Sequence, residues 1–208
     1  MIDLEDITRA LAAHAPETLP GAGRRRAAVA MILRARDAGA EVLFIERARH
    51  EGDPWSGHMA FPGGRLDPGD AHPRAAAERE TYEEVGIALQ EAQHIGRLTD
   101  LTGRGPVKQQ GLVISGHVYL LEREVPLVID RLEVAQAFWF PLRALHESER
   151  QVPYTAPGVT MRFPGILVGE PGRHVVWGLT YAFLEDFFGI VGTPLPSRWS
   201  VARNALVE

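Results

Sequence analysis

The sequence contains no cysteine, and this absence removes several kinds of chemistry at once. Without thiols the chain forms neither disulfide bonds nor thiolate metal sites, and it has no cysteine nucleophile. It also lacks an apolar run near the ~20 residues that a membrane-spanning helix needs. Residues 1–6 have neither the basic nor the apolar region of a signal peptide. We therefore expect a cytoplasmic protein with no membrane span.

An excess of positive charge is absent as well. The formal net charge is -5 at pH 7 and the isoelectric point is near 5.9, whereas a surface that binds nucleic acid normally needs a basic face. The composition is otherwise ordinary for a globular protein, with 45% hydrophobic and 24% charged residues among 208. These values predict one well-buried domain and no nucleic-acid partner.

The pattern of apolar residues predicts a mixed α/β fold. A helix is expected at the N-terminus, a β-hairpin after it, and a central helix that begins at Pro73 and stops at Gly86. Strands before and after a central helix predict a mixed sheet that is covered on both faces. The expected helices span 3–14, 73–85 and 178–189, and the expected strands span 27–33, 42–45, 58–61, 93–100, 111–121, 137–141 and 159–163.

The most informative stretch joins a glycine turn, Phe61-Pro62-Gly63-Gly64, to an acidic helix. That helix carries Glu80, Glu83 and Glu84 at positions i, i+3 and i+4, a spacing that places three carboxylates on one helical face. Like charges at this spacing destabilise an isolated helix by roughly 0.2–0.5 kcal/mol per pair, so they need solvent or a cation. Grouped carboxylate oxygens suit Mg²⁺ or Mn²⁺. The three glutamates are therefore predicted metal ligands.

The same stretch resembles the Nudix box, whose usual form is Gly-x5-Glu-x7-Arg-Glu-U-x-Glu-Glu-x-Gly-U, where U is aliphatic. Residues 79–87 match its second half, except that Thr81 occupies an aliphatic position. In the first half Asp70 replaces the glutamate, and eight residues rather than seven separate it from Arg79. Both departures, with the preceding Phe-Pro-Gly-Gly, resemble the branch of coenzyme A diphosphatases. That branch has an upstream arginine where this chain has Asp53.

The resemblance implies a Nudix-type α/β/α sandwich with a mixed β-sheet, formed by a single domain over 1–208 whose core lies at about 25–190. It also implies metal-dependent hydrolysis of a diphosphate bond in a nucleoside diphosphate-linked substrate, with coenzyme A or a derivative as the first choice. ADP-ribose, dinucleoside polyphosphates and other nucleotides are the alternatives, and Asp53 favours them. A module that binds a nucleotide without cleaving it is a further alternative, against which the complete acidic cluster argues.

Within that resemblance, individual residues receive roles. Glu83 and Glu84 are expected to act in catalysis as well as in metal binding. Arg79 is expected to hold a neighbouring carboxylate, because its planar guanidinium matches two carboxylate oxygens. Gly63 and Gly64 lack side chains and would let the backbone approach a substrate phosphate closely.

Other residues keep two interpretations. The run Arg24-Arg25-Arg26 is either a solvated face or a phosphate clamp, and we predict that it binds substrate. Asp70 is either the N-cap of the central helix or a weak metal ligand. Glu133 lies outside the motif and is a candidate for the general base, as are the glutamates within it.

Aromatic residues and the last helix are also ambiguous. Trp177 belongs to a Trp-Gly-x-Thr element similar to one in the coenzyme A branch, yet a tryptophan before an apolar helix is more often part of a core. Trp55 either lines the substrate entrance or packs a loop, and His58 and His117 are expected to be structural. The apolar helix at 178–189 either packs inward or forms the interface of a homodimer.

Overall fold

Two β-sheets and three α-helices form the part of the chain that the computed structural model describes, namely residues 3–20, 24–53, 55–89, 93–103, 111–156 and 160–196. The helices are α1 (Leu4–Ala13), α2 (Pro73–Val85) and α3 (Gly178–Ile190), and short 3₁₀ segments cover Leu142–His146 and Ser148–Arg150. The larger sheet contains β1 (Arg26–Arg34), β2 (Glu41–Arg47), β3 (Met59–Ala60), β4 (Gly63–Arg65), β5 (Gln93–Arg97), β6 (Leu101–Gly103), β7 (Leu112–Leu121) and β8 (Val134–Pro141). The smaller sheet contains β9 (Gln151–Thr155), β10 (Arg162–Leu167) and β11 (Val175–Trp177).

The larger sheet is mixed, as the sequence predicts. Its main order is β3-β2-β1-β7-β5, and β1 runs parallel to β7 along its whole length. The strand β1 pairs with β2 at Leu33 and Arg34 but with β4 at residues 27–29. The strands β1 and β2 therefore pair only where β1 ends and β2 begins. The glycine turn and β4 occupy the other end.

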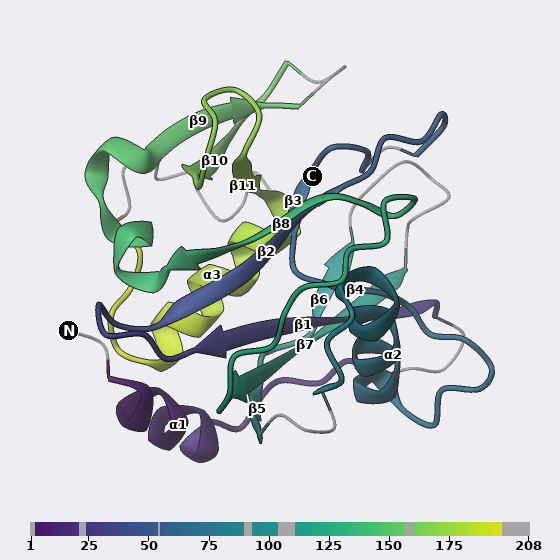
Figure 1. Ribbon diagram of the computed structural model, residues 1–208, viewed down its shortest axis with the longest axis horizontal. Helices are drawn as coiled ribbons and strands as arrows, with labels where there is room; N and C mark the ends of the chain where they lie inside the picture. The colour runs from purple at the N-terminus through teal and green to yellow at the C-terminus, as the bar shows by residue number, and fades with distance from the viewer. Residues whose placement is uncertain are drawn as a thin grey trace.

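Alternating side chains of β1 pack against helices on opposite faces of the larger sheet. Ala28, Ala30 and Ile32 share a cluster with apolar residues of α2, whereas Met31 and Leu33 share another with residues of α1 and α3. Successive residues of a strand point to opposite faces, so this division confirms the predicted sandwich. Figure 1 shows the smaller sheet at the end of the molecule opposite α1, beside α3.

The helix α3 is apolar and packs inward, which was one of the two alternatives for this segment. Its side chains Tyr181, Phe183, Leu184, Phe187 and Phe188 are all buried within the described chain. No described helix is long and apolar enough to cross a membrane.

Local signals explain the bounds of α2. Pro73 occupies the first turn, where its missing N–H costs nothing, and the Nδ1 atom of His72 accepts a hydrogen bond from the Ala75 N–H at 3.0 Å. The cap is therefore His72, which excludes the N-cap role, one of the two alternatives for Asp70. Gly86 ends the helix in the left-handed conformation, with φ of 73°, which glycine adopts without steric cost.

Several strands differ from the prediction. The expected strand at 93–100 ends at Arg97 as β5, and a separate strand that was not predicted, β6, follows at Leu101–Gly103; both pair with β7. The expected strand at 159–163 lies later, at 162–167, and residue 159 is outside the described residues. The strands β4, β9 and β11 were not predicted. The first is a glycine-rich triplet and the second contains Pro153, so neither has an apolar alternation to recognise.

Candidate functional site

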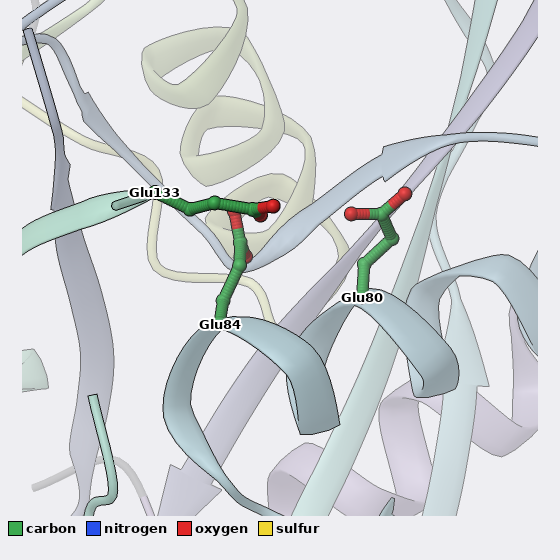
Figure 2. Close-up of side chains that lie close together, drawn as sticks. All are labelled: Glu80, Glu84 and Glu133. Atoms are coloured by element: carbon green, nitrogen blue, oxygen red, sulfur yellow. The ribbon is translucent and has the colours of Figure 1, made fainter. Parts of the chain in front are cut away.

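Three glutamates converge beside the glycine turn. Glu80 and Glu84 extend from neighbouring turns of α2, and Glu133 reaches them from the turn that precedes β8 (Figure 2). One carboxylate oxygen from each residue lies within 4.8 Å of the other two. Three anionic oxygens at this separation repel one another strongly unless a cation or a proton lies between them. The donor set therefore fits a hard divalent cation.

Burial disfavours the ionised form of Glu84, so this carboxylate needs a positive charge nearby. Its residue surface is only 1% exposed, and burial raises the pKa of its carboxyl to about 8. The Gly63 N–H donates to Glu84 Oε2 at 2.9 Å, and a guanidinium nitrogen of Arg47 lies 3.9 Å from Glu84 Oε1. These two contacts favour the ionised form without overcoming the burial. Burial likewise raises the pKa of Glu80.

The glycine turn fits this cluster because its residues have no side chains. At Gly64 a Cβ atom would lie 2.3 Å from the Cδ atom of Glu80, and at Gly63 it would lie 2.3 Å from the backbone oxygen of Ala28. Gly63 also has a φ of 148°, which other residues rarely adopt. The backbone of Gly63 and Gly64, rather than a side chain, therefore contacts the glutamates.

Arg79 fixes the acidic helix to the loop before it. Its guanidinium donates to both carboxylate oxygens of Asp70, at 3.2 and 3.0 Å, and to Glu80 Oε1 at 3.0 Å and Glu83 Oε2 at 2.9 Å. It also donates to the backbone oxygen of Arg65 at 3.1 Å. The bond from Arg79 lowers the pKa of Asp70. The geometry thus agrees with the predicted holding role of Arg79, and it makes Asp70 an anchor for that arginine.

The glutamate cluster opens into a cleft of about 630 Å³. One wall is β2 with the loop that follows it, and another is the N-terminal end of α3, whose first turn has no side-chain cap. Such a helix end carries a partial positive charge. The polar and aromatic side chains that line the cleft include Arg47, His50, Asp53, Trp55, His58, Arg65, Trp177 and Thr180.

A comparison with known proteins decides the family. A family model described as the NUDIX domain matches residues 23–159, which is more than half of the chain. The chain belongs to the Nudix family. The matched range includes the cluster and the glycine turn, whereas β10, β11 and α3 lie beyond it.

Relatives with this domain are similar over most of the chain. A mitochondrial coenzyme A diphosphatase of Homo sapiens is 33% identical over 138 residues, which cover 66% of this chain and 55% of that protein. An uncharacterized protein of Schizosaccharomyces pombe is 33% identical over 167 residues, covering 69% and 50%. The chain thus spans about half the length of these two relatives. A Nudix hydrolase named NudL in Photorhabdus laumondii is 34% identical over 140 residues, covering 63% and 67%.

Solved structures support the fold. A NUDIX hydrolase from Nitrosomonas europaea superposes with a TM-score of 0.51 at 15% identity, covering 83% of this chain and 93% of that chain. At this identity the likeness concerns the fold alone. The predicted Nudix fold is confirmed by this likeness and by the layers described above.

The structure brings together only part of the predicted Nudix site. Glu80 and Glu84 belong to the cluster, and Gly63 and Gly64 line the cleft. The side chain of Glu83 is 48% exposed and pairs with Arg79 instead. The third member of the cluster is Glu133, which sequence reasoning considered only as a base. The metal role of Glu83 stays a prediction.

The basic run predicted to bind substrate lies elsewhere. Arg24 and Arg25 are exposed, a guanidinium nitrogen of Arg26 lies 3.5 Å from Asp100 Oδ2, and none of the three lines the cleft. The arginines that do line it are Arg47 and Arg65. Sequence reasoning missed both, because a single arginine at a strand end has no distinguishing pattern.

The structure places both of the ambiguous tryptophans, Trp55 and Trp177, at the cleft. Trp177 is stacked on Tyr154, with ring centroids 4.7 Å apart, and the His58 ring meets its edge at 4.9 Å. Tyr154 comes from β9 and Trp177 from β11, so the smaller sheet supports this wall of the cleft.

Proposed function

We propose that this protein hydrolyses the diphosphate bond of a nucleoside diphosphate-linked substrate with the help of Mg²⁺ or Mn²⁺, and that coenzyme A or a derivative is the substrate. The observation that carries the reaction is the convergence of Glu80, Glu84 and Glu133 beside a glycine turn. Carboxylates alone would repel a diphosphate. With a divalent cation between them, they become a site that attracts it.

The chain's own residues have distinct tasks in this reaction. Glu80, Glu84 and Glu133 would hold the cation, which supplies Lewis acidity toward the diphosphate and activates water. Glu133 is exposed, unlike Glu84, so its carboxylate is accessible to accept the proton of an attacking water. Arg47 and Arg65 line the cleft and would stabilise charge on the phosphate and leaving-group oxygens. Glu80 and Glu84 remain alternatives for the base.

Three features support coenzyme A. The human relative with 33% identity is named a mitochondrial coenzyme A diphosphatase, and this chain carries the Phe-Pro-Gly-Gly turn that the resemblance to the coenzyme A branch rests on. The cleft also has apolar and aromatic walls from α3 and the smaller sheet. Such walls suit an adenine ring or a pantetheine chain.

ADP-ribose or another nucleotide is the second candidate, and Asp53 favours it. This carboxylate lines the cleft at the position where the coenzyme A branch has arginine. Its Oδ2 atom lies 3.4 Å from a guanidinium nitrogen of Arg47, and its Oδ1 atom accepts the Trp55 N–H at 3.1 Å. Each oxygen keeps a further acceptor site for a ribose hydroxyl group. An acid in that role is a common device for recognising a ribose.

A panel assay tests the proposal. The purified protein would be incubated with Mg²⁺ or Mn²⁺ and with coenzyme A, dephospho-coenzyme A, ADP-ribose, a dinucleoside polyphosphate or a nucleoside triphosphate. We expect the highest kcat/KM with coenzyme A or a derivative, and 3′,5′-ADP with 4′-phosphopantetheine as products of coenzyme A. The variant Glu84→Gln is the control for contaminating hydrolases.

The outcomes separate the class of reaction from the substrate. Highest kcat/KM with ADP-ribose or a dinucleotide would replace the substrate and keep the chemistry. Absence of turnover with the whole panel, together with tight binding of a nucleotide, would establish a module that binds without cleaving.

A further inference from the structure

A second hollow lies beside the catalytic cleft and is lined by arginines. It measures about 660 Å³ and is formed by Glu46, Ala48, Arg49, His50, Arg131, Leu132, Ala135 and Arg173. His50 lines both the hollow and the cleft. The two spaces are therefore neighbours.

The end of β2 separates these spaces by the alternation of its side chains. Glu46 and Ala48 line the hollow, whereas Arg47 between them lines the cleft, as expected where successive residues point to opposite sides. The turn before β8 also contributes to both spaces, since Arg131 and Leu132 line the hollow and Glu133 lines the cleft.

Two contacts connect the loops that form this boundary. The Ala48 N–H donates to the Glu133 backbone oxygen at 2.8 Å, and His50 Nε2 lies 2.6 Å from the Leu132 backbone oxygen. The backbone that presents Glu133 to the metal cluster thus also presents Arg131 and Leu132 to the hollow. A group bound in the hollow would be held at a fixed place relative to the cluster.

The charge of the hollow is positive. Its acid, Glu46, is 2% exposed and accepts two hydrogen bonds from Arg173, at 2.9 and 2.8 Å. Glu46 and Arg173 therefore largely neutralise each other. Among the residues that the structure describes, neither Arg49 nor Arg131 forms an ion pair with a carboxylate. Arg49 and Arg131 thus line the hollow without a described carboxylate partner.

One hydrogen bond orients Arg131, and it is the one bond of this side chain to a described residue. Its NH1 atom donates to the backbone oxygen of Ala135 at 2.7 Å, and a guanidinium group has five N–H donors in all. The guanidinium of Arg49 lies over the turn at Gly57, where a Cβ atom would be 3.5 Å from its Nε atom. Planar guanidinium groups pair well with the oxygens of a phosphate, because two N–H bonds can form in parallel.

We infer that this hollow binds a phosphate monoester that the substrate carries apart from its diphosphate. The inference rests on the proposed function for the substrate, and it deepens that function by assigning a second subsite. In coenzyme A the 3′-phosphate of the ribose is such a group. The diphosphate would lie at the metal cluster, and the monoester would lie across the boundary formed by His50 and Leu132, between Arg49 and Arg131.

Equilibrium binding tests the subsite without relying on turnover. Adenosine 3′,5′-bisphosphate and AMP differ only by the 3′-phosphate, so calorimetry with each ligand isolates its contribution. We expect the wild-type protein to bind the bisphosphate about 10- to 100-fold more tightly, the range for hydrogen bonds to charged groups. The double variant Arg49→Ala/Arg131→Ala should bind the two ligands equally, and its affinity for AMP should not change.

A matched variant controls for loss of surface charge. Arg143 is exposed and lines neither the cleft nor the hollow, so Arg143→Ala should retain the wild-type preference. Arg173→Ala is unsuitable, because it would leave Glu46 buried without its partner. The melting temperatures of both variants should match the wild type, since the replaced side chains are exposed.

Turnover gives the second measurement. Wild-type kcat/KM should be about 10- to 100-fold higher with coenzyme A than with dephospho-coenzyme A, and the double variant should lose this difference. Equal affinity of the wild type for the bisphosphate and AMP, or a preference that persists in the double variant, would overturn the subsite. Failure to cleave either substrate would instead overturn the coenzyme A proposal, while the binding result would still decide the subsite.

Discussion

The carboxylates of Glu83 and Glu84 are adjacent in sequence but lie in different environments. Glu84 is buried within the cluster, whereas Glu83 is half-exposed and accepts a hydrogen bond from Arg79 at 2.9 Å. A helix rotates by 100° per residue, so neighbours cannot both point into one cleft in the same way. The spacing of acids within the Nudix box therefore identifies candidate metal ligands, and burial distinguishes the one that lies in the cluster from the one that does not.

Replacement of Glu84 by Gln should abolish metal-dependent function. It keeps the side-chain volume and removes the charge, so we expect kcat/KM and Mn²⁺ affinity to fall by more than about 100-fold, beyond the usual loss for a residue that only supports a ligand. Mn²⁺ should raise the melting temperature of the wild type but not of the variant. Calorimetry and thermal unfolding measure both effects. A variant with wild-type Mn²⁺ affinity would exclude Glu84 as a ligand.

The corresponding Glu83→Gln variant separates two expectations. The sequence pattern predicts loss of Mn²⁺ affinity similar to that of Glu84→Gln. The contacts predict a smaller loss, because Glu83 acts through Arg79 rather than on the cluster. Titration of both variants under the same conditions decides which is right.

Arg79 should contribute stability through Asp70. The side chain of Asp70 is 7% exposed, so removal of the guanidinium leaves a nearly buried carboxylate without its charged partner, although the Asp67 N–H still donates to it. Such a loss costs about 1–3 kcal/mol, and Arg79→Ala should lower the free energy of unfolding in urea by that amount. The double variant Asp70→Asn/Arg79→Ala should recover part of the loss. Additive effects of the two single changes would show that the pair is not coupled.

At the scale of elements, the turn between β3 and β4 can be tested at two neighbouring glycines. A Cβ at Gly64 meets the end of the flexible Glu80 side chain, whereas a Cβ at Gly63 meets the backbone of β1. Gly64→Ala should therefore displace the Glu80 carboxylate, with a clear loss of Mn²⁺ affinity and a small change in melting temperature. Gly63→Ala should lower the melting temperature more, because backbone cannot move aside. Equal effects of the two changes on stability would contradict this assignment.

Elements with strong local signals could be predicted from the sequence. The helix α2 has a proline at its start and a glycine at its end, and β1, β2 and β7 are long apolar segments. The convergence of Glu133 with Glu80 and Glu84 could not be predicted, because it depends on β8 pairing with β2 at long range. Arg47 and Arg49 enter their sites through the same tertiary arrangement. Local pattern therefore gave the helix that holds the acids but not the full cluster.

For the molecule as a whole, segments outside the matched Nudix range complete the cleft. The strand β11 and the helix α3 supply Trp177, Leu179, Thr180 and Phe183 to its lining. The apolar contacts of α3 with β10 and β11 join this wall to the smaller sheet. Under the proposed function, this wall would contact the non-phosphate part of the substrate, whereas the diphosphate would lie at the glutamate cluster on α2 and beside the larger sheet.

Global stability should depend on pH through His117, which is buried on the central strand β7. Burial lowers the pKa of its imidazole to about 3, and the neighbouring His94, Arg97 and Arg74 act in the same direction, whereas Asp100 opposes them. In the unfolded chain a histidine has a pKa of about 6.5. Between these values the unfolded state binds a proton that the folded state does not.

The contribution of His117 to the free energy of unfolding should therefore fall as the pH decreases below about 6.5, by at most about 1.4 kcal/mol per pH unit. Glu84, whose pKa burial raises to about 8, contributes in the opposite direction. His117→Gln removes the titrating group and keeps a polar side chain opposite His94. In urea unfolding at several pH values between about 5 and 7.5, the free energy of unfolding of the variant relative to that of the wild type should rise as the pH falls. Other buried groups also titrate abnormally, namely His94 and His58 with lowered pKa values and Glu84 with a raised one, but they are present in both proteins and cancel in this difference. Identical pH dependence in the two proteins would mean that His117 has the same pKa in the folded and unfolded states.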